Sequence, residues 1–153
     1  MPKKNRTVPK ENDIVTHVVA VFGIVQKRNK FLIAKRESND PQAGGQWSIP
    51  GGKVELELGE DIIEKTLKKE VLEEVGIKIR DKVVFLGSEG FYRVSGHHVV
   101  GLTFLCTWKS GVAKPLEDQE EIKWITLKKL KKLRDLPDYM ESRIKLLENY
   151  FNR

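Results

Sequence analysis

The sequence predicts an α/β or α+β fold, in which a mixed sheet and its helices surround one core. Three observations lead to this prediction. The chain has 153 residues, which suits one ordinary domain and is short for two. Runs of β-branched residues alternate along it with stretches of helical period. Its composition, 39% hydrophobic and 33% charged, is typical of a globular protein and too apolar for a disordered one.

The N-terminal segment differs from the rest of the chain. Residues 1–12 contain two prolines, several basic residues and almost no apolar side chains. We therefore expect residues 1–12 to form a flexible basic tail, and residues 13–153 to form a single domain without internal repeats or a linker.

Strands are expected where β-branched and aromatic residues gather between turn residues. They cover residues 16–25, 31–34, 47–49, 83–88, 99–109 and 123–125. Residues 38–46 and 117–121 are interpreted as loops, the second of them acidic. Residues 61–75 have the 3.6-residue period of a helix and precede Gly76, a residue typical of a helix C-terminus. A second amphipathic helix is expected from Pro137 to about Phe151.

The cysteine content and the longest apolar run indicate where the protein works. A single cysteine, Cys106, excludes an intramolecular disulfide and is typical of a reducing compartment. The longest apolar run, Val18 to Val25, has eight residues, whereas a membrane-spanning helix needs about 20. This run starts late, ends in basic residues and lacks the small-residue cleavage site of a secretory signal. We expect a cytoplasmic protein without a membrane partner.

The net charge is +6, from 28 basic and 22 acidic residues. The excess is concentrated in residues 1–10 and 128–134. Such clusters attract polyanions, either nucleic acid or phosphorylated metabolites. The alternative interpretation is a solvated tail and a solvated helix face.

Three glutamates gather on one side of the helix expected over residues 61–75. On a helical wheel of about 100° per residue, Glu70, Glu73 and Glu74 share an arc of about 100°. They repel one another by a few tenths of a kcal/mol per pair, and they oppose the helix dipole near its C-terminus. The lysines of this helix are placed on the opposite side, where we expect them not to neutralise the cluster. These lysines are Lys65, Lys68 and Lys69.

A bound divalent cation would resolve the conflict within this cluster. Carboxylate oxygens are the hard donors that Mg²⁺ prefers. The turn Pro50-Gly51-Gly52 follows a short strand and allows close approach to its backbone, so one of its carbonyls is a further candidate ligand. The alternative is an acid-rich helix end exposed to solvent.

The glycine turn and the acidic helix together resemble the signature box of the Nudix hydrolases. That box reads G-x5-E-x7-R-E-U-x-E-E-x-G-U, where U is an aliphatic residue. Residues 69–77, KEVLEEVGI, match its second half at every defined position except that Lys69 replaces the arginine.

The first half of the box departs further from the family pattern. Gly52 is followed by three extra residues, placed within 56–60, before the second half begins. Either Glu60 or Asp61 therefore takes the position of the first glutamate. The surroundings of the box also resemble the family, at residues 31–36, 47–50 and 120–124.

The resemblance implies a mixed β-sheet sandwiched between helices, with the box as a loop-helix-loop. It also implies a hydrolase that cleaves a pyrophosphate bond in a nucleoside triphosphate, or in a nucleoside diphosphate linked to another moiety, and releases a nucleoside monophosphate. Carried over residue by residue, it implies that Glu70, Glu73 and Glu74 hold Mg²⁺, with Mn²⁺ as a substitute, together with the carbonyl of Gly51.

Further roles follow from the same resemblance. The catalytic base is either Glu70 or an acid of the 117–121 loop, where we favour Glu120 as the base or an added metal ligand. Lys69 and the first acid of the box, Glu60 or Asp61, orient the box. Arg36 is a candidate phosphate contact, with an exposed strand end as the alternative.

The expected partner is a small nucleotide, and the expected assembly is a monomer or a homodimer. Two other functions stay open at this point. The basic clusters would suit a pyrophosphohydrolase that acts on the 5′ end of RNA. A non-catalytic nucleotide-binding regulator is the other alternative, although such a protein has little use for three mutually repelling glutamates.

Overall fold

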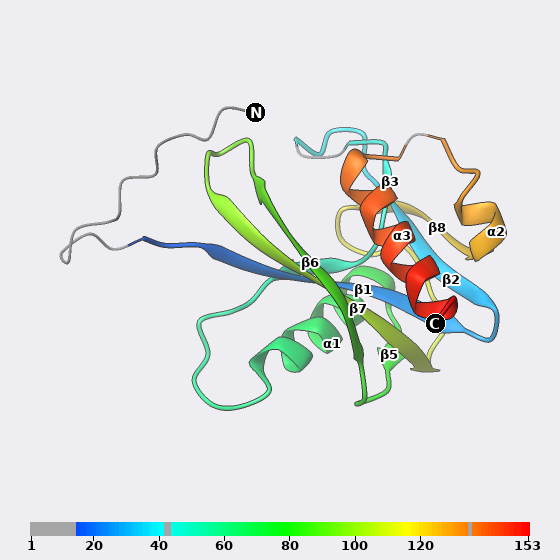
Figure 1. Cartoon of the computed structure of the whole chain (residues 1–153), viewed down its shortest axis with the longest axis horizontal. Coiled ribbons are helices and arrows are strands. Elements are labelled where there is room, and N and C mark those ends of the chain that lie inside the picture. The colour runs from blue at the N-terminus through cyan, green and yellow to red at the C-terminus, as the bar shows by residue number, and fades with distance from the viewer. Residues whose placement is uncertain (1–14, 42–43, 135) are drawn as a thin grey trace.

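The computed structural model describes residues 15–41, 44–134 and 136–153, and it forms a mixed sheet with helices on both faces (Figure 1). The strands are β1 (Val18–Lys27), β2 (Lys30–Arg36), β3 (Trp47–Ser48), β4 (Gly51–Lys53), β5 (Lys78–Ile79), β6 (Val84–Tyr92), β7 (His98–Ser110) and β8 (Gln119–Thr126). The helices are α1 (Ile62–Val75), α2 (Leu127–Leu130) and α3 (Asp138–Phe151). The tail expected over residues 1–12 lies outside the described residues.

The sheet is built around β1 and β7, which pair in parallel from Val18↔Val99 to Gln26↔Thr107. The other strand pairs are antiparallel. β1 and β2 pair only beside their hairpin turn and then separate, and β4 pairs with β1 from Ala20 to Phe22. The glycine turn is therefore attached to the middle of the central strand. The predicted mixed sheet is confirmed.

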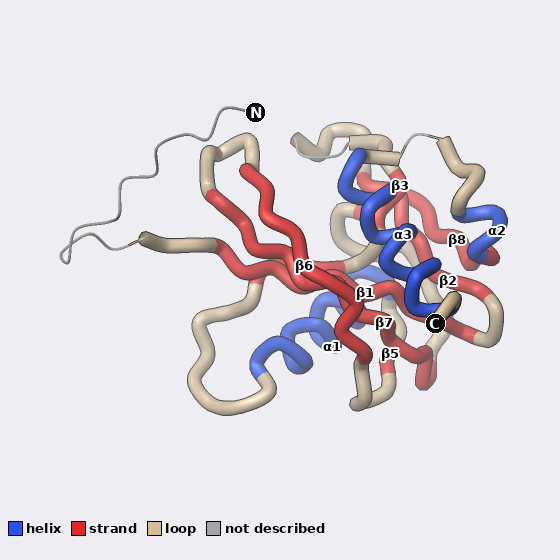
Figure 2. Tube along the Cα trace, in the orientation of Figure 1, coloured by secondary structure: helices blue, strands red, loops and turns tan. Residues whose placement is uncertain are grey.

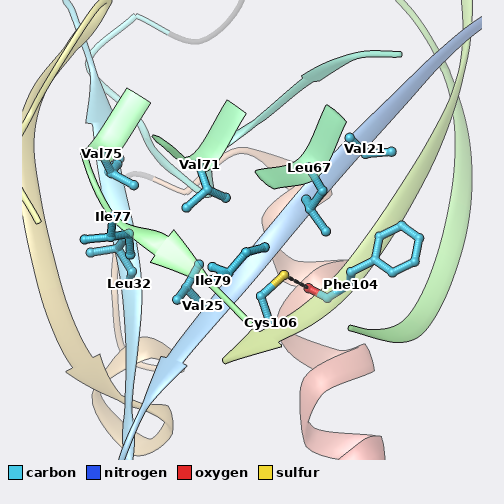
Figure 3. Packing of buried hydrophobic residues seen from close by; sticks show 11 residues of the cluster. Val21, Val25, Leu32, Leu67, Val71, Val75, Ile77, Ile79, Phe104 and Cys106 are labelled. Atoms are coloured by element: carbon cyan, nitrogen blue, oxygen red, sulfur yellow. Dashed lines mark hydrogen bonds between the residues drawn. The ribbon is translucent and has the colours of Figure 1, made fainter. Parts of the chain in front are cut away.

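Side-chain alternation along the strands gives the sheet two buried faces. On β1, Val21 and Val25 belong to the core under α1, whereas Ile24 belongs to the core under α3. Figure 3 shows side chains of α1 pointing toward the strands in the first of these cores. Cys106 is fully buried in the same core. The tube in Figure 2 shows that α1 and α3 lie on different sides of the strands.

The ends of α1 follow from its flanking residues. Gly76 has φ 71°, and its N–H donates to the carbonyl of Leu72 over 3.0 Å, so this glycine ends the helix as predicted. Asp61, also in the left-handed region with φ 56°, immediately precedes the helix.

Several predicted bounds were wrong. The acidic loop expected over 117–121 is shorter, because β8 begins at Gln119, where it pairs with Arg36 of β2. The strands β4 and β5 were not predicted, since each has at most three residues and takes its strand geometry from a longer neighbour.

No helix in the described part of the chain combines the length and the apolar character needed to cross a membrane.

Candidate functional site

The glycine turn of β4 lies directly against the glutamates of α1. The Gly51 N–H donates to Oε2 of Glu74 over 3.0 Å. The carboxylate of Glu70 occupies the space that a side chain at position 52 would need, since a Cβ on Gly52 would lie 2.5 Å from Cδ of Glu70. A Cβ on Gly51 would lie only 2.3 Å from the carbonyl oxygen of Val21. Position 51 therefore requires glycine, because its Cβ would meet backbone, whereas a Cβ at position 52 would displace the flexible carboxylate of Glu70.

Burial makes the charged form of this cluster unfavourable. Glu74 is 8% exposed, and burial raises its pKa to about 8, although the Gly51 hydrogen bond and the charge of Arg36 act in the opposite direction. The pKa of Glu70 is also raised, first by burial and then by the charges of Glu73 and Glu117. The protein environment therefore opposes ionisation of Glu70 and Glu74, and a cation close to them would favour it.

Glu117 joins this cluster through the loop that follows β7. The N–H groups of Lys114 and Leu116 donate to the carbonyls of Val75 and Glu74, over 3.1 and 3.0 Å, and so satisfy the C-terminal end of α1. The next residue is Glu117, and its charge raises the pKa of both Glu70 and Glu74. The acidic loop was predicted as part of the site, but Glu120 was the residue favoured within it.

The place of Glu117 follows from a tertiary contact and not from a local sequence pattern. Leu116, the residue before the acidic loop, packs beside Gly76, with its Cδ1 3.3 Å from the position of a Cβ there. This contact fixes the residue that follows it. Glu120 lies farther along, on β8, where its side chain is half-exposed and 3.8 Å from Nζ of Lys35.

Lys69 behaves differently from the prediction. The expectation that the lysines of α1 leave the cluster unneutralised is wrong for this residue, whose Nζ lies 3.9 Å from Oε1 of Glu73. The reason is geometric, because residues i and i+4 are only about 40° apart on the helical wheel. Lys69 also forms an ion pair with Glu55, which sequence reasoning did not single out.

The other two box-orienting candidates are exposed. Glu60 and Asp61 both lie at the surface just before α1, and the side chain of Asp61 makes no capping hydrogen bond. The structure thus pairs Lys69 with Glu55, which lies just after the glycine turn and five residues before Glu60.

Arg36 lies at the end of β2, close enough to the cluster for its charge to lower the pKa of Glu74. Its Nε donates to Oδ2 of Asp40 over 2.9 Å, which positions the guanidinium. The structure therefore brings together Arg36, Gly51, Glu70, Glu73 and Glu74 from the predicted set, and adds Glu117.

The donor set fits a hard divalent cation. Among the described residues, no three His, Cys, Asp or Glu side chains converge as a ready-made metal site. The carboxylates present are Glu70 and Glu74, held around an accessible glycine turn with raised pKa values. An open set of oxygen donors of this kind suits Mg²⁺, which keeps several waters and takes oxygens from a bound phosphate.

The chain is similar over most of its length to a family model and to a curated protein. The family model described as NUDIX domain matches residues 16–148. The chain is 31% identical over 142 residues to an ADP-ribose pyrophosphatase of Methanocaldococcus jannaschii, covering 90% of this chain and 81% of that protein.

Two solved structures share the fold. A MutT protein from Methanosarcina mazei Go1 matches with a TM-score of 0.74 and 21% identity, covering 90% of this chain and 96% of that one. A MutT NUDIX hydrolase from Burkholderia pseudomallei matches with a TM-score of 0.72 and 24% identity, covering 86% and 98% of the two chains.

Proposed function

The chain belongs to the Nudix family of pyrophosphohydrolases, and from this premise we propose that it hydrolyses a nucleoside diphosphate linked to a sugar, in a magnesium-dependent reaction. A nucleoside triphosphate is the second substrate class. The ADP-ribose pyrophosphatase at 31% identity favours the first class over the second. The observation that carries the proposal is the placement of Glu70 and the buried Glu74 against the glycine turn, because two carboxylates with raised pKa values at one turn suit a site completed by a cation.

The residues of the box have separate tasks in this proposal. Glu70, Glu73 and Glu74, with the carbonyl of Gly51, would hold the ion. When bound, Mg²⁺ neutralises the pyrophosphate oxygens and lowers the pKa of a bound water. Lys69 keeps Glu73 and the segment around Glu55 in place, since it contacts both.

Two further side chains act on the substrate. We assign the base to Glu117, because its charge acts on both Glu70 and Glu74, and Glu120 stays the alternative. The base takes a proton from the attacking water, whose oxygen forms a new bond to phosphorus while the bond from phosphorus to the bridging oxygen breaks. Arg36, positioned by its hydrogen bond from Nε to Asp40, binds a phosphate oxygen.

The experiment is a substrate panel with Mg²⁺ in ¹⁸O-labelled water. The panel contains ADP-ribose, ATP, GTP and 5′-triphosphorylated RNA. We expect AMP and ribose 5-phosphate from ADP-ribose as the fastest reaction, and loss of activity in excess chelator. Activity that persists in chelator would contradict the proposal. Release of only the terminal phosphate from ATP would indicate a different mechanism.

Variants then test the site itself. Glu70→Gln and Glu74→Gln should each lose at least about tenfold in kcat. The matched control is Glu121→Gln, which removes an exposed acid that pairs with Lys123 on β8. An equal loss in all three variants would show that the effect is one of overall charge.

A further inference from the structure

One end of the molecule carries a positively charged surface that the proposed reaction does not use. Residues 26–36 cover the end of β1, the turn that follows it and β2, and residues 122–134 cover most of β8, α2 and the four residues after it. These two segments contain eleven basic residues and no acidic one. β2 and β8 pair from Lys30↔Thr126 to Arg36↔Gln119. The fold therefore joins two basic segments, distant in the sequence, into one surface.

The charges at the tip of this surface are unpaired. Figure 1 shows the β1–β2 turn and α2 at the same end of the molecule. Within the described residues, no acid forms an ion pair with six exposed basic side chains at this tip, which we call the basic end: Lys27, Arg28, Lys30, Lys128, Lys129 and Lys132. Two acids do reach the surface, and they pair with its other lysines, Glu121 with Lys123 and Glu148 with Lys131. A set of unpaired like charges attracts a polyanion.

The basic end lies away from the candidate active site. Lys30 begins β2, whereas Arg36, whose charge acts on Glu74, ends it. A strand of this length spans roughly 20 Å, at about 3.3 Å per residue. Charges that far apart are largely screened at physiological salt, where the Debye length is about 8 Å. The pyrophosphate of a substrate at the glycine turn therefore does not neutralise the basic end.

An aromatic ring lies among these charges. An open hollow of about 390 Å³ is lined by the half-buried Trp124 of β8 and by the β1–β2 turn, which consists of Lys27, Arg28, Asn29 and Lys30. Nζ of Lys27 lies 4.0 Å from the ring centre of Trp108 and 5.9 Å from that of Trp124. The lysine thus lies closer to Trp108, and Trp124 contributes the aromatic wall of the hollow.

These features favour a single strand of nucleic acid over other polyanions. The phosphates of such a strand repeat along it and contact several cations at once, and its unstacked bases can lie on an aromatic ring. A duplex keeps its bases stacked and offers none to Trp124. An anionic membrane is disfavoured, because none of the large hydrophobic side chains exposed in the described part of the chain belongs to residues 26–36 or 122–134.

We propose that the basic end binds a single strand of nucleic acid, with phosphates on its lysines and arginine and one base stacked on Trp124. RNA and DNA share these phosphates and bases, and the experiment below distinguishes them. The proposal does not depend on the proposed function, because the bound strand does not enter the carboxylate cluster.

The first test measures binding to the wild-type protein in chelator, where the proposed hydrolysis stops. Fluorescence anisotropy follows three labelled dodecamers with 5′-hydroxyl ends, namely uridine RNA, thymidine DNA and a DNA strand without bases. We expect RNA and DNA to bind at least about tenfold more tightly than the strand without bases. The slope of log K against log salt should be about −3, from four or five phosphate contacts. A tenfold preference between RNA and DNA would support the proposal and identify the strand.

Three results would overturn the proposal. The first is no binding of either RNA or DNA at about 50 mM salt. The second is equal binding of the strand without bases, which would show that no base is stacked. The third is tighter binding of phosphatidylserine vesicles or of polyglutamate than of both oligonucleotides, which would assign the basic end to a membrane or to an acidic protein.

The second test reverses charge at the basic end with the double variant Lys30→Glu and Lys128→Glu. The matched control is Lys65→Glu with Lys82→Glu, which changes the net charge equally at two exposed lysines elsewhere. The first double variant should bind the RNA at least about tenfold more weakly, with a salt slope shallower by about 1.4. The control should bind it as the wild-type protein does, and both should hydrolyse ADP-ribose normally.

An equal loss of RNA binding in the two double variants would overturn the proposal, because it would show an effect of overall charge. Should the variant at the basic end fail to fold, the comparison of strands with and without bases in the wild-type protein still decides.

Discussion

Each face of the sheet buries an ionisable side chain, and the two faces differ in how far the protein neutralises its charge. Under α1, Glu74 is 8% exposed and keeps a pKa raised to about 8, because the neighbouring positive charge offsets only part of the cost of burial. Under α3, Arg143 is 1% exposed and is paired with Glu89 at 2.7 Å. Burial lowers the pKa of Arg143, and the charge of Glu89 opposes that shift. One face neutralises its charge within the protein, whereas the other leaves that task to a ligand.

The two faces meet at the glycine turn, and the largest expected effects are there. Gly51→Ala would place a Cβ against the carbonyl of Val21 and the ring of Phe22, so both faces should be disrupted. We expect a loss of about 3–5 kcal/mol in the free energy of unfolding. Chemical denaturation measures this loss. If Gly51→Ala is as stable as the wild-type protein, the two faces of the sheet do not both depend on the glycine turn.

Gly52→Ala is the matched substitution that affects only the face under α1. Its Cβ would meet the flexible carboxylate of Glu70, which moves aside without a backbone shift. We expect stability within about 1 kcal/mol of wild type and a loss of about 100-fold in kcat, because the displaced carboxylate no longer positions the reacting groups. A variant with full activity would show that the position of Glu70 is unimportant.

The buried charges themselves should respond with opposite signs. Arg143→Met leaves Glu89 without its partner and should destabilise the protein by about 2–4 kcal/mol. Glu74→Gln keeps an acceptor for the Gly51 N–H and removes an unfavourable charge, so in chelator it should stabilise the protein by about 1–3 kcal/mol at pH 8. Urea unfolding of both variants in chelator measures the two signs. If both variants lose stability, the protein stabilises the charged carboxylate of Glu74 as well as it stabilises the guanidinium of Arg143.

The raised pKa of Glu74 predicts how the stability of the metal-free protein depends on pH. A carboxyl group whose pKa is higher in the folded state favours folding while it is protonated, so its contribution is lost as pH rises from 4.5 to about 8. The metal-free protein should therefore become less stable over this range, by about 2–4 kcal/mol. Thermal melts in chelator at several pH values measure the slope of stability against pH. Glu74→Gln should largely remove this slope, and Glu121→Gln should not.

Mg²⁺ should reverse that dependence, because it binds the ionised carboxylates of the folded protein. Melts in Mg²⁺ should show greater stabilisation at pH 8 than at pH 5. A stabilisation that is the same at both pH values would argue against these carboxylates as the ligands.

The smallest effect is expected at the surface ion pair of Lys69. Its side chain and that of Glu55 are both 43% exposed. Glu55→Gln should therefore change stability by no more than about 0.5 kcal/mol. A destabilisation above about 1 kcal/mol would show that this ion pair contributes to stability as a buried pair does, like Arg143 with Glu89, and not as a solvated surface pair.

The sequence predicted the elements whose own residues specify them. Gly76 marks the end of α1, and the β-branched residues of β1 and β7 mark long strands. β4 was not recognised, because Gly51 and Gly52 have no side-chain pattern and become a strand only through pairing with β1.

The candidate site shows the same limit. The three glutamates of α1 were found because one helix turn and one family motif bring them together. Glu117 and Glu55 reach the site only through contacts with α1, at Leu116 and Lys69. Arg143 and Glu89 come from α3 and β6, and no local pattern connects two residues that are 54 positions apart in the sequence.

The parallel pairing of β1 with β7 has a consequence for how the protein is made. β1 leaves the ribosome well before β7, so the partner that covers one of its edges is complete only at residue 107. Until then this apolar strand has an open edge that can pair with other chains. A message truncated before β7 would therefore encode the three glutamates of α1 and still yield an aggregation-prone product. We expect chaperones to engage the nascent chain during this interval, and to release it once the second half of β7 has emerged.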